Sequence, residues 1–109
     1  KILDKEKVVG YAYIGKAPSK TDLFDYLILL NTEFIVAKTK VLIYRENYGG
    51  EIGSRRWLKQ FIGLKSQDKV IYGKDIIPIS GATISTKSMT RAVNSFLQNL
   101  QVLIDNDVL

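Results

Sequence analysis

A long amphipathic stretch near the C-terminus constrains the fold of this chain more than any other feature of its sequence. Between about Thr86 and Ile104, apolar residues recur at the three- and four-residue spacing of an α-helix: Met89, Val93, Phe96, Leu97, Leu100, Leu103 and Ile104. A helix with one apolar stripe has to bury that stripe against another layer of structure. The rest of the chain must therefore supply a layer for it to cover.

Segments typical of β-strands fill most of the first half of the chain. Residues 8–15 are rich in β-branched and aromatic side chains, and residues 26–30 form a solid apolar run. Residues 34–37 and 41–44 predict one further strand that is bent or split between them. Residues 70–72 predict another short strand. The layer under the helix is thus predicted to be a sheet of four or five strands.

A short helix is predicted between the sheet and the long helix. Ser54 is a suitable N-cap, Trp57 and Phe61 lie one helical turn apart, and Gly63 ends the pattern. The fold class is therefore α+β: a small, mainly antiparallel sheet with one short helix and a long C-terminal helix. A length of 109 residues fits one domain, residues 1–109. Because the chain starts at Lys1, we expect this domain to be a piece of a larger exported or membrane-anchored protein.

The composition excludes several classes of site. The chain has no cysteine and no histidine, which excludes a disulfide scaffold, Cys/His zinc sites, cysteine-ligated iron–sulfur clusters and Ser-His or Cys-His nucleophile pairs. Redox chemistry would therefore need an organic cofactor. The net charge of +5 favours anionic partners such as a phosphate-bearing cofactor. The basic residues form no block, and we expect no nucleic-acid partner.

Small and hydroxyl-bearing residues gather where the extended segment meets the long helix. The hydroxyls are those of Ser80, Thr83, Ser85, Thr86 and Ser88. Gly81 and Ala82 let the backbone approach a ligand closely, Lys87 adds a positive charge, and the helix start offers unpaired N–H groups. Together these features predict a phosphate site. Residues 80–83 alone are also explained by helix capping and a turn.

The same segment also resembles a P-loop in part. Gly81, Thr86, Lys87 and Ser88 match G-x-x-x-x-G-K-S except that Thr86 replaces the second glycine. That glycine lets the loop wrap the phosphate. In addition, only 21 residues follow Ser88, too few for the remaining strands of a nucleotide hydrolase. We therefore rank nucleotide hydrolysis third among the candidate functions.

Residues 79–85 together with the helix that follows favour a different class of protein. Residues 79–85, Ile-Ser-Gly-Ala-Thr-Ile-Ser, followed by a helix containing Ala-Val-Asn at residues 92–94, resemble the FMN-binding domain family. That family includes the flavin subunits of the sodium-pumping quinone reductase and of the Rnf complex. Its members carry FMN esterified to the last residue of an S/T-G-A-T/S motif by a flavin transferase that uses FAD. The resemblance implies that Thr83 is the attachment point, with Ser80, Gly81, Ala82, Ser85, Thr86 and Lys87 around the phosphate.

The resemblance extends upstream with some departures. Residues 45–53, Arg-Glu-Asn-Tyr-Gly-Gly-Glu-Ile-Gly, resemble the E-T-P-G-L-G loop of the family, which implies that Glu46 and Gly53 lie near the flavin ring. Tyr44 and Tyr48 suit either sheet packing or flavin contact. Ile77 stands where many members have an acidic residue, and Asp75 is two residues further away.

These observations lead to two competing functions. The first is a flavin-carrying electron-transfer domain with no substrate transformation of its own, located extracytoplasmically. Its partners would be the flavin transferase and a membrane or periplasmic redox protein. The alternative is a non-redox binding module that holds an anionic ligand or a partner protein non-covalently.

Overall fold

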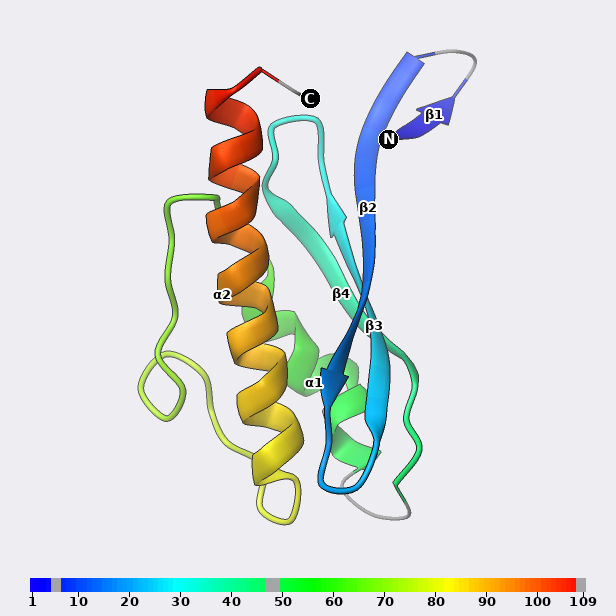
Figure 1. The fold of residues 1–109 in the computed structure, drawn as a ribbon, viewed down its shortest axis with the longest axis vertical. Coiled ribbons are helices and arrows are strands. Elements are labelled where there is room, and N and C mark those ends of the chain that lie inside the picture. The colour runs from blue at the N-terminus through cyan, green and yellow to red at the C-terminus, as the bar shows by residue number, and fades with distance from the viewer. Residues whose placement is uncertain (5–6, 47–49, 108–109) are drawn as a thin grey trace.

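The predicted α+β fold is confirmed. The computed structural model describes residues 1–4, 7–46 and 50–107. In chain order its elements are β1 (Ile2–Asp4), β2 (Lys7–Pro18), β3 (Leu23–Leu30), β4 (Val36–Ile43), the 3₁₀ helix η1 (Gly50–Gly53), α1 (Arg55–Leu58), the 3₁₀ helix η2 (Lys59–Phe61) and α2 (Thr83–Asp105). Figure 1 shows α2 lying along one side of the sheet, with α1 near its lower half.

The four strands form one antiparallel sheet in the order β1-β2-β3-β4. Every second residue of β3 is buried, namely Phe24, Tyr26, Ile28 and Leu30. This face meets the stripe of α2 formed by Met89, Val93, Leu97 and Leu100, all of which are buried. The sheet and the long helix therefore bury each other as the sequence predicts, because strand and helix periodicities each direct one apolar face inward.

One of the predicted strands is found and another is not. The strand predicted from residues 34–37 and 41–44 is β4, which runs unbroken from Val36 to Ile43, and Phe34 lies in the preceding turn with a φ of 62°. The Asn31 side chain accepts hydrogen bonds from the N–H groups of Glu33 and Ile35, at 2.9 and 3.0 Å, which lengthens that turn. Residues 70–72 form no strand. There the N–H and C=O groups of Val70 bond the side-chain amide of Asn94 on α2, at 3.0 and 2.8 Å.

The short helix forms as predicted. The Ser54 hydroxyl accepts a hydrogen bond from the N–H of Trp57 at 3.2 Å, and Gly63 follows η2 with a φ of 92°. Trp57 and Phe61 are buried, with their rings edge-to-face 5.3 Å apart. This confirms the prediction that they belong to the core.

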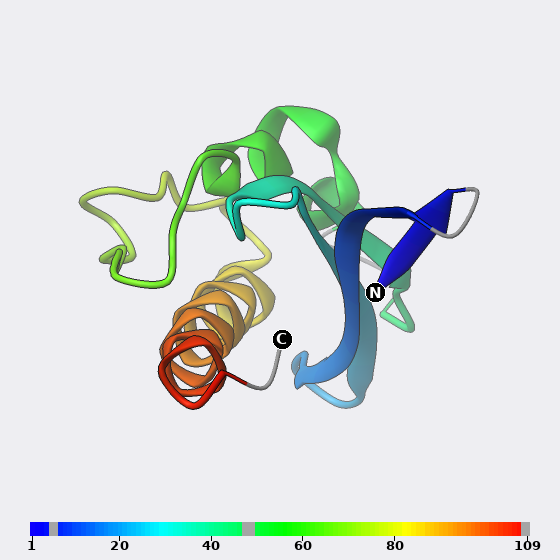
Figure 2. The same ribbon diagram turned by 90° about the horizontal axis from the view of Figure 1, so that it is seen from above.

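The two long edges of the sheet differ. Beside β4, the N–H of Gly63 bonds the carbonyl of Val36 at 2.8 Å, and the Thr39 hydroxyl bonds the carbonyl of Leu58 at 2.9 Å. The segment from α1 to residue 64 therefore covers that edge. On the other side, β1 pairs with β2 only as far as Gly10. Figure 2 shows β2 at the rim of the curved sheet, across from α2.

The long helix starts three residues earlier than its apolar pattern predicts, at Thr83. Thr86 causes this extension, because both its N–H and its hydroxyl donate to the carbonyl of Ala82 at 2.9 Å. The hydroxyl thus reinforces the first helical hydrogen bond. As a result Thr83 and Ser85 lie in the first turn of α2 and not in the loop before it.

Candidate functional site

The start of α2 offers backbone donors to solvent. Ala82 is the N-cap residue, and its side chain cannot accept a hydrogen bond from the N–H groups that follow. The N–H groups of Thr83, Ile84 and Ser85 consequently have no partner within the helix. A 23-residue helix also places the positive end of its dipole here. Both features favour an anion beside Thr83.

The five hydroxyls of the segment are not equally accessible. Ser85, Thr86 and Ser88 are buried, at 2%, 0% and 5% exposure, whereas Ser80 and Thr83 are exposed. The Thr83 hydroxyl forms no hydrogen bond with any described residue. Only Ser80 and Thr83 therefore present an accessible hydroxyl to a second molecule.

Two tyrosines hold the buried hydroxyls. The Tyr44 hydroxyl lies 2.8 Å from that of Ser85, and the Tyr72 hydroxyl lies 2.7 Å from that of Thr86. Tyr44 follows β4 and Tyr72 belongs to the loop before α2, so the first turn of the helix is fixed from two directions. Ser85 and Thr86, which the resemblance puts around the phosphate, direct their hydroxyls to these tyrosines.

A pocket of about 230 Å³ opens beside Thr83. It is lined by Lys20, Tyr44, Gly81, Ala82, Thr83, Ile84 and Ser85. Sites that enclose a whole drug-sized ligand have volumes of about 300–1,000 Å³. This pocket therefore fits the phosphate end of FMN and not the complete cofactor. Lys20, from the turn between β2 and β3, was missed because nothing in the local sequence connects it with α2.

Gly81 suits its position for a conformational reason. Its φ is 81°, a value that L-residues rarely adopt, and a Cβ added there would meet no atom within 4 Å. The glycine is thus required by the backbone turn and not by crowding. It leaves open space next to Ser80 and Thr83.

Lys87 lies one helical turn after Thr83 and is exposed. Its ammonium group is 5.8 Å from the centre of the Tyr72 ring, a cation–π distance. Side chains four residues apart share one face of a helix. Lys87 therefore brings a positive charge to the side of α2 that carries Thr83.

Glu46 is tied to the turn between β2 and β3. Its carboxylate accepts hydrogen bonds from the Ser19 hydroxyl at 2.5 Å and from the Thr21 N–H and hydroxyl, each at 2.9 Å. These bonds, first that of Ser19, hold the pKa of Glu46 below its usual value. Glu46 thus lies beside the turn that also contributes Lys20 to the pocket.

Residues 45–53, which the resemblance puts near the flavin ring, do not all lie beside Thr83. Gly53 lines a different pocket, together with residues of β4 and α1. The structure does not bring it into the pocket that contains Thr83. Tyr48 lies outside the described residues. The assignment of Glu46 and Gly53 to the flavin ring stays a prediction.

The segment before the motif is held by α1. The indole N–H of Trp57 donates to the carbonyl of Ile77 at 2.7 Å, and the N–H of Ile77 donates to the Gln60 side chain at 2.7 Å. Asp75 instead accepts a hydrogen bond from the N–H of Ile71 at 2.7 Å, which closes its own loop. Asp75 therefore stabilises a turn of this segment.

Other classes of site find no support in the described part of the chain. Residues 83–88 are helical, so they cannot form the loop that a P-loop requires between its first glycine and its lysine. No three acidic side chains among residues 1–4, 7–46 and 50–107 gather closely enough to hold a metal ion. None of the helices described is both long and apolar enough to cross a membrane.

Comparison with known proteins agrees with the resemblance seen in the sequence. The model of the FMN-binding domain family matches residues 4–98, which includes β2, β3 and β4, the short helix and most of α2. Comparison with curated proteins gives no match. The family match confirms the resemblance, and the open, anion-favouring start of α2 fits the phosphate of the cofactor. The chain belongs to the FMN-binding domain family, and FMN is its cofactor.

Proposed function

We propose that this chain is an electron carrier whose FMN is joined through its phosphate to the hydroxyl of Thr83. One observation carries the choice of residue. Of the motif's hydroxyls, that of Thr83 is exposed, has no partner among the described residues, and stands at the first position of α2. Ser80 is also exposed but lies before the helix, one residue from the sharp turn at Gly81.

The surrounding residues would hold the phosphate after attachment. The N–H groups at the start of α2 can donate to its oxygens, and the helix dipole favours its negative charge. Lys87 adds a positive charge on the same side of the helix. Tyr44 and Tyr72 fix the first turn, so these donors keep their directions.

Attachment requires a transferase and FAD. The Thr83 hydroxyl oxygen would attack the FMN phosphorus of FAD, forming a phosphoester as the bond to the AMP phosphate breaks. AMP leaves, and the hydroxyl proton passes to a base of the transferase. The exposure of Thr83 supports this step, because a second protein has to reach its oxygen.

The bound cofactor supplies one- and two-electron transfer, and the protein supplies position and local charge. We propose that the ring lies toward the loop of residues 46–53, as the family resemblance implies. The donor and acceptor would be membrane or periplasmic redox proteins, and the location extracytoplasmic. A covalent link would keep the cofactor on the domain there.

The experiment is export of the full chain in a host with an active flavin transferase, followed by intact mass measurement. We expect the wild-type mass to rise by one FMN less one water. The Thr83→Val variant should lack that increase, and Ser80→Ala, the matched control for the other exposed hydroxyl, should keep it.

Two results would contradict the proposal. A wild-type chain without added mass, whose flavin is released on denaturation, would indicate reversible FMN binding. Added mass that persists in Thr83→Val would move the attachment elsewhere.

Electron transfer has its own test, which is reversible reduction and reoxidation of the attached flavin by one-electron mediators. Failure of reoxidation would favour a non-redox binding module.

A further inference from the structure

The turn between β2 and β3 brings Lys20 to the pocket that contains Thr83. Figure 1 shows this turn and the start of α2 at the same end of the molecule. Among the described residues that line the pocket, Lys20 is the only one with a charged side chain. The pocket lining therefore carries one cation and no carboxylate, a combination that suits an anion.

The lysine of the motif itself does not line this pocket. The ammonium group of Lys87 lies 5.8 Å from the centre of the Tyr72 ring, and Lys87 is not among the lining residues. A lysine ammonium is a compact charge on a flexible stem, and it offers three N–H donors. Lys20 is therefore the lysine placed to donate to a phosphate oxygen inside the pocket.

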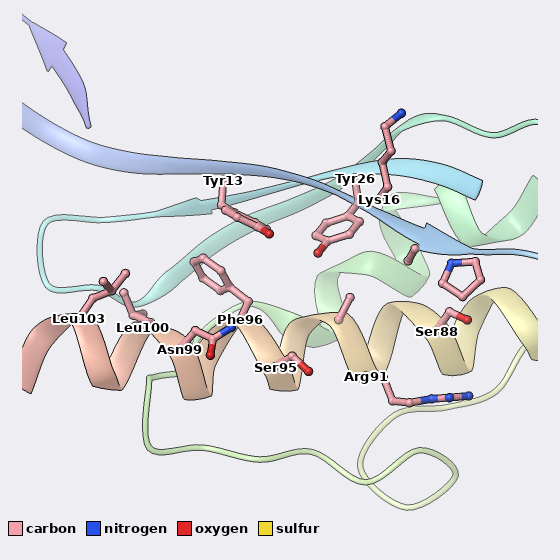
Figure 3. A pocket seen from close by; sticks show the side chains of 13 residues that line it. Tyr13, Lys16, Tyr26, Ser88, Arg91, Ser95, Phe96, Asn99, Leu100 and Leu103 are labelled. Atoms are coloured by element: carbon pink, nitrogen blue, oxygen red, sulfur yellow. The ribbon is translucent and has the colours of Figure 1, made fainter.

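Ring contacts hold the two strands joined by this turn against α2. Figure 3 shows Tyr13 of β2 and Tyr26 of β3 directed toward α2, and Phe96 of α2 directed toward them. The ring centroids of Tyr13 and Phe96 are 4.9 Å apart, and those of Tyr13 and Tyr26 are 6.2 Å apart. Packing of these strands on the helix thus sets where the turn lies relative to α2.

The Glu46 carboxylate holds the residues on both sides of Lys20. It accepts hydrogen bonds from the Ser19 hydroxyl at 2.5 Å and from the N–H and hydroxyl of Thr21, each at 2.9 Å. Lys20 thus projects from a backbone that three hydrogen bonds to one carboxylate keep in place. Such preorganisation lowers the entropy cost of holding a ligand.

Glu46 acts on the pocket through the turn and not by contact. It is not among the residues that line the pocket. Both of its carboxylate oxygens accept hydrogen bonds from the turn. A carboxylate near an anion site would otherwise repel the anion, and these donors stabilise its negative charge.

We infer that Lys20 binds the phosphate of FMN and that Glu46 is a positioning residue, which fixes the turn that carries Lys20. The inference rests on the proposed place of the phosphate beside Thr83. It gives Glu46 a role different from the contact with the flavin ring that the family resemblance implies. Neither Lys20 nor Glu46 belongs to the continuous motif of residues 80–83.

The test compares FMN with riboflavin, which has the same ring and ribityl chain but no phosphate. The full chain is produced without a flavin transferase, and each flavin is titrated against it with flavin fluorescence as the readout. We expect the wild type to bind FMN more tightly than riboflavin. Lys20→Ala should weaken FMN binding about three- to tenfold and leave riboflavin binding unchanged.

Two further variants control for the charge and for the position of this lysine. Lys20→Arg keeps a cation that can bind phosphate, so it should retain most of the affinity for FMN. Lys7→Ala removes an exposed lysine at the other end of β2. It should bind both flavins as the wild type does.

Glu46→Gln tests the positioning role. We expect it to weaken the binding of FMN but not of riboflavin, and to have no further effect in the Lys20→Ala background. Loss of the negative charge alone would instead strengthen FMN binding, so the direction of the change separates the two roles. Glu33→Gln, at an exposed carboxylate in the turn before β4, is the matched control.

Three results would overturn the inference. The first is a wild type that binds FMN no more tightly than riboflavin, including one that binds neither. The second is a Lys20→Ala variant that binds FMN as the wild type does or loses affinity for both flavins alike. The third is a Glu46→Gln variant that binds FMN as tightly as the wild type or more tightly, or that weakens FMN binding equally without Lys20.

The covalent attachment is judged separately, by the intact mass of the exported chain. If the mass increase is absent while Lys20→Ala still weakens only FMN binding, the attachment to Thr83 fails and the role of Lys20 stands. If the mass increase is present and Lys20→Ala has no selective effect, only the role of Lys20 fails.

Discussion

The Tyr44 hydroxyl lies 2.8 Å from the buried hydroxyl of Ser85, and this contact joins the end of the sheet to the first turn of α2. Ser85 is 41 residues further along the chain. The helix start that carries Thr83 is thus positioned by the sheet as well as by its own turn.

Removal of one partner of this contact should cost more than removal of both. Tyr44→Phe leaves the buried Ser85 hydroxyl without its partner, and we expect the free energy of unfolding to fall by about 1–2 kcal/mol. The double variant Tyr44→Phe/Ser85→Ala should recover part of that loss, because no polar group remains unpaired. Urea unfolding of the two single variants and the double variant measures the coupling. Strictly additive losses would show that the two hydroxyls do not interact.

Substitution at Gly81 should show a purely conformational cost. Gly81→Ala meets no neighbouring atom but has to keep a φ of 81°, so we expect a loss of about 1–2 kcal/mol. Gly53→Ala is the control, since that site is equally open and has no positive φ. It should be neutral or slightly stabilising. Equal losses at both sites, measured by thermal and urea unfolding, would contradict this account.

A steric cost is expected instead at Gly15. A Cβ there would lie 2.5 Å from the hydroxyl oxygen of Tyr26 and 2.6 Å from its ring. The Tyr26 ring is buried and cannot move freely, so Gly15→Ala should destabilise by about 1–3 kcal/mol. Ala12→Val, at an exposed position of the same strand, is the control and should unfold at nearly the wild-type urea concentration.

Glu46 should make the stability depend on acidity. Its hydrogen bonds to Ser19 and Thr21 lower its pKa in the folded chain, so its contribution to stability is present above the unfolded pKa and is lost as the pH falls through the folded one. Glu46→Gln should therefore lower the free energy of unfolding at neutral pH. Between about pH 5 and pH 2, the free energy of unfolding should fall less in this variant than in the wild type. Urea midpoints across that range provide the measurement.

The matched control for Glu46 is Glu33→Gln, at an exposed carboxylate with no side-chain hydrogen bond to a described residue. It should retain the wild-type acid dependence. Asp25 adds to that dependence in both variants, since hydrogen bonds from Arg45 and Lys16 lower its pKa. An acid dependence that is identical in wild type and Glu46→Gln would refute the role of Glu46.

Sequence patterns predicted the features that depend on neighbouring residues. The cap at Ser54, the apolar run of residues 26–30 and the stripe of α2 are all local, and the structure has each as the cap, strand or helix predicted. The turn at Gly81 is local as well. The candidate site could be located for the same reason, because its motif is one continuous string.

Contacts across the chain could not be predicted in this way. Asn94 replaces the expected strand at Val70 by bonding its backbone from 24 residues away. The Glu46 carboxylate accepts a hydrogen bond from the N–H of Thr21, 25 residues earlier in the chain. The Ser85 hydroxyl is buried against Tyr44, whereas the Thr83 hydroxyl two residues earlier is exposed, and the sequence motif alone does not separate the two. Such distinctions come from tertiary packing, which overrides the local pattern.

Trp57 is the only tryptophan of the chain, and its indole is hydrogen bonded to Ile77, three residues before the motif begins at Ser80. The chain therefore contains its own optical reporter. Tryptophan emission overlaps the absorption of oxidised flavin, so attachment beside Thr83 should quench Trp57 by energy transfer. Reductive bleaching of the flavin should restore the emission, and the Thr83→Val chain should stay bright throughout. Intrinsic fluorescence would then report both occupancy and redox state without any label.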